Sequence, residues 1–226
     1  MNQEQQGKTF LVSRQVKSRL PRYYRYLKQL LDKGIFRISS SALAKMMGLT
    51  ASQIRQDLNC FGGFGQQGYG YNVKFLFSQI SDILGVNDSF RAILVGMGNL
   101  GSSMAASDVF MSRGIELVAL FDASPKIIGK TVAGKTVYDV KKLASFLEEN
   151  PVEIAALTLT ESEAVAVAEE LKALGIKGIW NFTNAEIPSD DTISVMNVYL
   201  GDSLMQLCFD VRNKEGKMPT DGKERE

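Results

Sequence analysis

The sequence contains no histidine and only two cysteines, Cys60 and Cys208, among 226 residues. Histidine is the side chain most often used for general acid–base catalysis near neutral pH, so its absence disfavours many enzyme classes. The two shortages together argue against a disulfide-rich secreted domain and against most zinc sites. No apolar run approaches the roughly 20 residues that span a bilayer, and residues 1–10 lack the layout of a signal peptide. We therefore expect a cytoplasmic protein without a metal site or membrane association.

Charge is unevenly distributed along the chain, although the net charge is only +1. Residues 1–85 carry 12 Lys and Arg against 4 Asp and Glu, a net charge of +8, whereas residues 86–226 carry 14 against 21, a net charge of −7. A basic half is typical of a protein that binds a polyanion. Charge runs also occur on ordinary solvated surfaces. The basic half therefore indicates nucleic-acid binding only if a binding motif is found in the same residues.

The first half begins with a pattern typical of two helices. Apolar residues recur at helical intervals over residues 13–33. Pro21 lies inside this stretch, and we expect it to interrupt the helix and to start a second helical segment. A short helix is expected after Ser39–Ser41, with its end at Gly48.

A third helix and a hairpin complete this half. Thr50 and Gln53 have the spacing of a capping box, in which each side chain bonds the other residue's free amide. Glycines and aromatic residues alternate over residues 62–71, which indicates a tight hairpin. Three helices followed by a hairpin predict a winged helix-turn-helix domain over residues 1–85.

The third predicted helix has the properties of a DNA-recognition helix. Ile54, Leu58 and Phe61 form one apolar stripe, so the polar residues face outward or sideways. An ordinary amphipathic surface helix has the same pattern, but the basic first half and the hairpin favour DNA binding. The side chains expected to contact base edges in the major groove are Gln53, Arg55, Gln56 and Asn59. The expected phosphate contacts are Arg14, Lys17, Arg19, Arg22, Arg25, Lys28 and Lys45.

From Arg91 the sequence alternates between strand and helix patterns. The strands are expected at residues 92–95, 115–121, 152–159, 178–182 and 193–199, and the helices from the glycine motif to about 112, then at 140–149, 163–174 and 202–209. This alternation predicts a doubly wound α/β fold with a parallel sheet, a Rossmann domain, over residues 86–211. Residues 212–226 are charged, and we expect a disordered tail.

A dinucleotide-binding motif opens the second domain. The run Gly96, Met97, Gly98, Asn99, Leu100 and Gly101 follows a predicted strand and begins a predicted helix. Its glycines allow a pyrophosphate to approach the amides at the helix N-terminus. Asp122 ends the next strand, where an acid bonds both ribose hydroxyls and repels a 2′-phosphate, so NAD(H) is favoured over NADP(H). A second G-x-G-x-x-G match, at residues 63–68, follows a helix and is rejected.

The chain resembles the Rex family of redox-sensing transcriptional repressors from about Ser18 to Phe209. The most specific stretches are residues 18–27, 38–40, 53–58, 61–65 and 68–71, the loop 96–101 and the pair Asn181 and Phe182. The resemblance implies a homodimer that binds a palindromic operator and is released by NADH. It also implies that the helix at residues 202–209 is exchanged between subunits.

The predicted recognition surface departs from the family pattern at two places. Gln56 occupies a position where the family often has lysine; glutamine pairs with adenine, so we expect an A/T-rich palindrome. Gln66 and Gln67 replace a Lys-Arg pair at the tip of the wing, where they are expected to contact DNA. Fewer charges there predict a shallower salt dependence of binding.

The family's switch residues also differ. In relatives, an arginine of the first helix alternates between a tyrosine and an acid; Arg25 matches the arginine, whereas Ser107 and Tyr199 stand at the two partner positions. A neutral partner holds an arginine less strongly than a carboxylate does. A Rex-like regulator with a weakened or altered nucleotide response therefore remains an alternative.

Two further alternatives follow from the residues. A small NAD-dependent oxidoreductase needs a substrate domain and a positioned acid or base, for which residues 86–211 leave little room. A regulator that binds CoA or a nucleoside is opposed only by Asp122 and by the spacing of the glycine motif. We expect a regulator that is not an enzyme.

Overall fold

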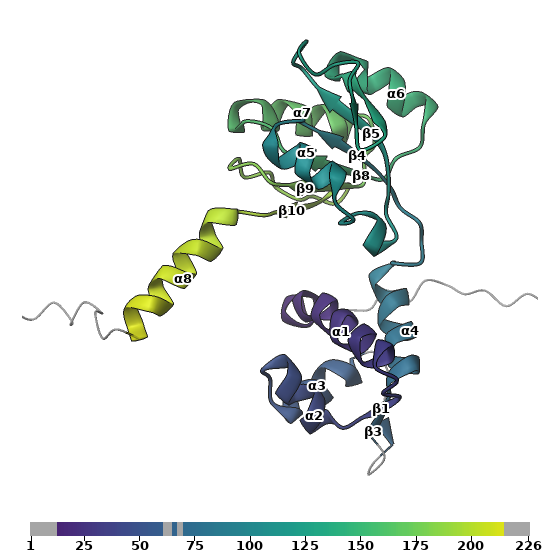
Figure 1. The fold of residues 1–226 in the computed structure, drawn as a ribbon, viewed down its shortest axis with the longest axis vertical. Coiled ribbons are helices and arrows are strands. Elements are labelled where there is room, and N and C mark those ends of the chain that lie inside the picture. Colours follow the sequence, from purple (N-terminus) through teal and green to yellow (C-terminus); the bar gives the residue numbers. More distant parts are fainter. Residues whose placement is uncertain (1–12, 61–64, 67–69, 215–226) are drawn as a thin grey trace, which may run out of the picture. The chain divides into compact units, whose positions relative to one another are not determined.

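A computed structural model describes residues 13–60, 65–66 and 70–214 of the chain. The chain divides into two compact units, Met1–Asp88 and Ser89–Glu226 (Figure 1). The division lies three residues after the boundary expected from sequence. Within the described part of the chain, no helix has the length and apolarity needed to cross a membrane.

The first unit combines four helices with a small sheet. Its helices are α1 (Arg14–Asp32), α2 (Ser40–Met47), α3 (Ala51–Asn59) and α4 (Val73–Leu84). Its strands are β1 (Arg37–Ile38), β2 (Gly65–Gln66) and β3 (Gly70–Asn72). They form an antiparallel sheet in the order β1-β3-β2, in which β2 and β3 are the two arms of the wing. The predicted winged helix-turn-helix is confirmed.

Local sequence explains where these helices begin and end. Side-chain oxygens of Ser13, Ser39, Thr50 and Asn72 accept hydrogen bonds from the free amides of the first turns of α1 to α4. The expected capping box of Thr50 and Gln53 is present. Gly48 ends α2 in the left-handed conformation, with φ of 63°.

Pro21 does not interrupt the first helix, contrary to expectation. Helix α1 runs unbroken from Arg14 to Asp32, with Pro21 exposed in its interior. A proline removes one helical hydrogen bond and crowds the preceding turn. Buried Leu20 and Tyr23 lie on either side of it, so tertiary packing keeps the helix in one piece.

The core of the first unit joins α1, α3 and α4. Tyr23 and Leu27 of α1, Ile54 and Leu58 of α3 and Leu76 of α4 are fully buried in one cluster. The predicted inward stripe of α3 is therefore present at Ile54 and Leu58, while its third member, Phe61, lies outside the described residues.

The second unit contains a seven-stranded sheet. Its strands are β4 (Arg91–Val95), β5 (Glu116–Asp122), β6 (Thr131–Val132), β7 (Lys135–Asp139), β8 (Ile154–Leu157), β9 (Gly178–Asn181) and β10 (Ser194–Asn197). Their order is β10-β9-β8-β4-β5-β7-β6, and every pairing is parallel except that of β6 with β7. The chain first adds β5 and β7 on one side of β4 and then adds β8, β9 and β10 on its other side. The boundary between β4 and β8 is therefore the switch point of a Rossmann fold.

Helices cover both faces of this sheet. Ile93 and Val95 point to a core shared with α6 (Leu143–Glu149) and α7 (Glu161–Ala173), and alternate residues of β4 point to a second core with α5 (Asn99–Ala106). Short 3-10 turns occupy Met111–Arg113 and Val140–Lys142. The predicted doubly wound fold is confirmed, and α8 (Leu200–Lys214) follows the last strand (Figure 1).

Three features of this unit differ from the prediction. The strands β6 and β7 were not predicted from sequence. Helix α5 ends at Ala106 rather than near 112, because the Ser107 hydroxyl bonds the Met104 carbonyl and the Val109 amide and diverts the backbone. Helix α8 continues to Lys214, so the first three residues of the predicted tail are helical. Residues 215–226 lie outside the described residues.

Candidate functional site

The glycine motif forms a tight loop between β4 and α5, at the switch point of the sheet. Gly96 has φ of 99°, and a Cβ there would lie 2.7 Å from the Thr158 carbonyl oxygen. A Cβ on Gly101 would lie 2.0 Å from the Gly96 carbonyl oxygen. These two glycines are therefore required by the packing of the loop itself.

Gly98 differs from the other two glycines of the motif. It has no positive φ, and a Cβ built on it meets no atom within 4 Å. It is the N-cap of α5, where no side chain caps the helix, unlike α1 to α4. Asn99 and Leu100 follow it in the exposed first turn. The loop thus leaves open space above free helix amides, which suits an anionic pyrophosphate.

Thr158, just past the end of β8, holds the loop from the neighbouring strand. Its hydroxyl donates a 2.6 Å hydrogen bond to the carbonyl oxygen of Gly96. A Cβ on Gly101 would lie 2.7 Å from the same hydroxyl oxygen. Thr158 was not identified from sequence, although residues at the carboxyl ends of strands beside a switch point are the ones expected to face a ligand.

Asp122 lies at the end of β5 beside the loop, as expected. Its carboxylate accepts hydrogen bonds from the amide of Met97, at 2.6 Å, and from the amide of Ser124, at 2.7 Å. Each carboxylate oxygen has a second acceptor site, so two sites remain for ribose hydroxyls. The negative charge stays at the position where a 2′-phosphate would approach.

A cavity of about 330 Å³ opens beside Asp122. Its walls are largely apolar and come from the ends of β4 and β5, the loop after β8 and the first turns of α7. The apolar lining consists of Val95, Ala123, Val140, Leu159, Ala166 and Val167. A flat apolar group such as a purine fits such a lining, next to an acid that can bond its ribose.

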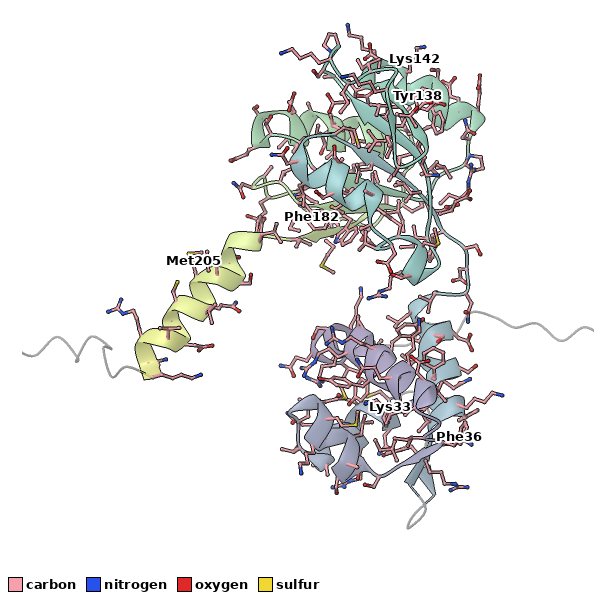
Figure 2. All side chains as sticks on the ribbon, viewed as in Figure 1. Lys33, Phe36, Tyr138, Lys142, Phe182 and Met205 are labelled. Carbon is pink, nitrogen blue, oxygen red and sulfur yellow. The ribbon has the colours of Figure 1, made fainter. Side chains whose placement is uncertain are left out.

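A second apolar cavity, also of about 330 Å³, lies along α5. Leu100, Met104 and Ser107 contribute from α5 and its end, and Trp180 and Phe182 (Figure 2) from the end of β9. Asn181, between these two residues in sequence, is fully buried; its side chain donates to the Ala185 carbonyl and accepts from the Thr183 amide. Trp180 was not identified from sequence, because it occupies an ordinary strand position.

The recognition helix α3 exposes most of the residues predicted to read DNA. Gln56 and Asn59 are exposed, and exposed Arg55 donates a 3.3 Å hydrogen bond to the Ser40 hydroxyl. The Gln53 side chain is exposed, but its carbonyl oxygen accepts from the Thr50 amide in the capping box. Of the wing residues, Gln66 lies on β2, and Gln67 lies outside the described residues.

The predicted phosphate contacts whose side chains the structure describes fall into two groups. Lys17, Arg25, Lys28 and Lys45 are exposed. Arg19 instead forms a bidentate ion pair with Asp57, at 2.7 Å for each bond, and Arg22 donates to the Met47 carbonyl at the end of α2. Arg14 lies in the first turn of α1. The structure thus assigns Arg19 and Arg22 contacts within the domain that the sequence pattern did not indicate.

Of the three switch candidates, one lies in the first unit and two lie in the second. Arg25 belongs to the first unit, where its guanidinium lies 5.7 Å from the ring centre of Tyr26. Ser107 lines the cavity along α5, and Tyr199 is the half-buried residue just before α8. Every residue of α8 is exposed, including Leu204, Leu207 and Met205 (Figure 2).

Two family models match parts of the chain. One, described as "Putative DNA-binding protein N-terminus", matches residues 11–59, and the other, described as "CoA binding domain", matches residues 87–185. A redox-sensing transcriptional repressor Rex from Clostridium beijerinckii is 44% identical over 204 residues, which cover 90% of this chain and 97% of the relative. The chain belongs to the Rex family.

Other Rex proteins agree with this assignment. The Rex repressor from Caldicellulosiruptor saccharolyticus is 46% identical over 203 residues, covering 90% of this chain and 93% of the relative. The solved structure of RSP in complex with beta-NAD+ and operator DNA is similar with a TM-score of 0.88 and 40% identity, over 95% of this chain and 99% of that one. The structure of RSP in complex with beta-NADH is similar with a TM-score of 0.83 and 39% identity, over 91% of this chain and 96% of that one.

Family membership identifies the chain as a relative of transcriptional repressors. The described residues contain no group of three or more Cys, Asp or Glu side chains placed to hold a metal. The Rossmann unit by itself does not decide between regulation and catalysis, because dehydrogenases share that fold.

Proposed function

We propose that the protein is a transcriptional repressor that binds a palindromic DNA operator and is released by NADH. The observation that carries the proposal is the joining, in one chain, of an exposed polar recognition helix to a glycine loop with Asp122 at its side. A Rex-family relative that is 40% identical over almost its whole length was solved with both beta-NAD+ and operator DNA, which supports each half. We also propose a cytoplasmic location, because the proposed partner is an operator in DNA.

NAD(H) is the proposed ligand of the Rossmann unit. Like CoA, NAD contains an adenosine diphosphate group, and the cavity beside Asp122 suits the adenine of either molecule. The two differ at the ribose: NAD has free hydroxyls, whereas the adenosine ribose of CoA carries a 3′-phosphate. Asp122 favours free hydroxyls and repels a phosphate next to it. We propose that the unit binds the cofactor without catalysing hydride transfer.

For DNA, we propose that Gln56, Asn59 and Arg55 contact base edges, while Lys45 contacts a phosphate. Only the side-chain NH2 group of Gln53 is left to contact a base, because its side-chain carbonyl oxygen accepts a hydrogen bond in the capping box. Glutamine recognises adenine with paired hydrogen bonds, so the proposed operator has A·T pairs where a lysine at this position would favour G·C.

A homodimer with exchanged α8 helices is the proposed assembly. Leu200, Leu204, Leu207 and Val211 are spaced four, three and four residues apart, so they form one apolar stripe along the helix. All four are exposed in a single chain. Burying this stripe against a second subunit would remove it from water, and a palindromic operator requires such a two-fold arrangement.

A regulator with a weakened NADH response is the second candidate. The Ser107 hydroxyl is engaged at the end of α5, where it bonds Met104 and Val109. Tyr199 supplies a neutral hydroxyl where a carboxylate would hold an arginine as an ion pair. Arg25 therefore has no charged partner at either position, and a ligand shifts a two-state equilibrium only by its difference in affinity for the two states.

The deciding experiment measures operator binding at fixed salt while the NADH to NAD⁺ ratio is raised. The duplex is a palindrome selected by the protein from a random pool. Loss of binding as NADH rises, with NAD⁺ alone permitting binding, supports the redox repressor. Binding that persists at saturating NADH supports the second candidate, and failure to select any sequence would contradict both. Absence of NADH oxidation with small carbonyl compounds is the expected result for a protein that is not an enzyme.

A further inference from the structure

A buried carboxylate lies on the inner face of the recognition helix. Asp57 of α3 is 2% exposed and lies next to the buried apolar residues Ile54 and Leu58. A charge in such a place is costly unless it is paired and hydrogen-bonded. Among the described residues, the hydrogen-bond partners of its carboxylate all lie on α1.

Arg19 and Tyr23, one helical turn apart on α1, together satisfy this carboxylate. The Arg19 guanidinium donates from Nε to Oδ2 and from Nη2 to Oδ1, each at 2.7 Å, and the Tyr23 hydroxyl donates to Oδ2 at 2.9 Å. Burial raises the pKa of Tyr23, and the hydrogen bond to Asp57 raises it further. The phenol therefore stays protonated and remains a donor. The hydrogen bond to Asp57 likewise raises the pKa of Arg19.

Helix α1 holds the other helix of the pair as well. Arg22, between these two residues in sequence, donates a 2.5 Å hydrogen bond to the carbonyl oxygen of Met47, the last residue of α2. That carbonyl has no partner within its own helix. The arginine fork on Asp57 and the contact at Met47 therefore tie both helices of the helix-turn-helix to one element.

The fork constrains α3 in a way that apolar packing does not. Ile54 and Leu58 contact the core without directional preference. Two parallel hydrogen bonds from a planar guanidinium fix both position and angle. With side-chain ends about 6 Å from the helix axis, a 10° rotation of the helix moves them by about 1 Å, which is enough to break a paired hydrogen bond to a base.

We propose that Asp57, held by Arg19 and Tyr23, is a positioning residue for base reading, which sets the rotation of α3 so that Gln56 and Asn59 face the groove. The inference rests on the proposed binding of operator DNA. Replacing a buried ion pair by apolar residues often leaves stability unchanged or improved, so stability alone gives little reason for a charge here. A requirement for one fixed orientation of α3 does give a reason for the buried ion pair.

The test compares two duplexes of equal length, the selected palindrome and one with scrambled half-sites, over a series of salt concentrations. The variants are Arg19→Lys, Arg19→Gln and Asp57→Asn, with Lys45→Gln as the matched control on an exposed cation. For the three variants we expect the preference for the palindrome to fall by about tenfold or more, comparable to the loss of one base contact. The slope of log affinity against log salt for the scrambled duplex should not change, because no phosphate contact is lost. Arg19→Lys keeps the charge but not the fork, so it should resemble Arg19→Gln.

The control should behave in the opposite way. Lys45→Gln is expected to weaken the binding of both duplexes alike. If Lys45 contacts one phosphate, the slope of log affinity against log salt should become shallower by about 0.9. If Arg19→Gln gives that pattern and Arg19→Lys restores binding, Arg19 is a phosphate ligand and the inference is wrong.

Stability is separated from positioning by measuring below the melting temperature of each variant. A lower melting temperature with an unchanged preference for the palindrome would reduce the cluster to a structural role and overturn the inference. Should Asp57→Asn fail to fold, Tyr23→Phe, which removes one of the three hydrogen bonds and keeps the ion pair, is expected to lower the preference by a smaller factor. A wild-type protein that selects no palindrome contradicts the proposed function and this inference with it. A wild-type protein that selects a palindrome, with variants that prefer it equally, contradicts this inference alone.

Discussion

The amide of Met97 donates a 2.6 Å hydrogen bond to the carboxylate of Asp122, which joins the glycine loop to the end of the neighbouring strand. The same carboxylate accepts from the amide of Ser124. Asp122 therefore acts on the protein itself as well as on the proposed ribose. It helps to hold the loop in shape before any nucleotide binds.

Asp122→Asn should lower the affinity for NADH and reduce the preference for NADH over NADPH. Asparagine lacks the charge that repels a 2′-phosphate. Its NH2 group would replace one of the two carboxylate oxygens and cannot accept a hydrogen bond from the backbone N–H of Met97 or Ser124. Fluorescence titration with each nucleotide measures the ratio, and a drop of about tenfold corresponds to about 1.4 kcal/mol. A ratio equal to that of the unmodified protein would remove Asp122 from the proposed specificity.

Gly101→Ala and Gly98→Ala should have different effects. A methyl group on Gly101 meets the Gly96 carbonyl at 2.0 Å, so we expect a lower melting temperature and loss of NADH binding. A methyl group on Gly98 meets nothing within 4 Å, so folding should be normal. It occupies the space left for the pyrophosphate, and NADH affinity should fall nonetheless. Calorimetry with and without NADH separates the two, and normal NADH binding by Gly98→Ala would contradict the proposed ligand position.

Thr158→Val tests the hydroxyl that holds the loop. The substitution keeps the shape but leaves the buried Gly96 carbonyl without its 2.6 Å bond, which costs about 1–3 kcal/mol of stability. Thr158→Ser keeps the hydroxyl and serves as the control. Thermal unfolding should show a lower midpoint for the valine variant than for the serine variant. Equal midpoints would mean that the bond contributes nothing.

Gln56→Lys should change the operator. Lysine favours guanine where glutamine pairs with adenine, so one A·T pair in each half-site should become G·C, with about 1–3 kcal/mol of discrimination at that position. Selection from a random duplex pool with both proteins measures this. Identical selected sequences would show that Gln56 does not read a base.

Leu204→Asp combined with Leu207→Asp should separate the proposed dimer. These side chains are 61% and 57% exposed in the single chain and form part of the apolar stripe of α8. A charge on each opposes their burial against a second subunit. Light scattering coupled to gel filtration should give the mass of one chain rather than two. Gln206→Asp, on the same helix, is the control and should leave the dimer intact; a dimeric double variant would exclude α8 from the interface.

Sequence patterns predicted most of the regular elements because their causes are local. Capping side chains, apolar periodicity and glycine positions each act within a few residues. The misses came from effects beyond that range. Strands β6 and β7 are short and half-exposed, and β7 becomes a strand by pairing with β5. Pro21 stays helical because distant core residues hold the turns on both sides.

The sequence alone determined the two-domain order, the glycine loop with Asp122 and the polar face of the recognition helix. Each depends on residue type at fixed spacing. Only the tertiary structure decided which arginines are available to DNA. Arg19 and Arg22 look like any other cations of a basic helix, yet one is bound to Asp57 and the other to the end of α2. Those partners lie 38 and 25 residues away, and only the packing of α1 on the helix pair brings them within hydrogen-bonding distance.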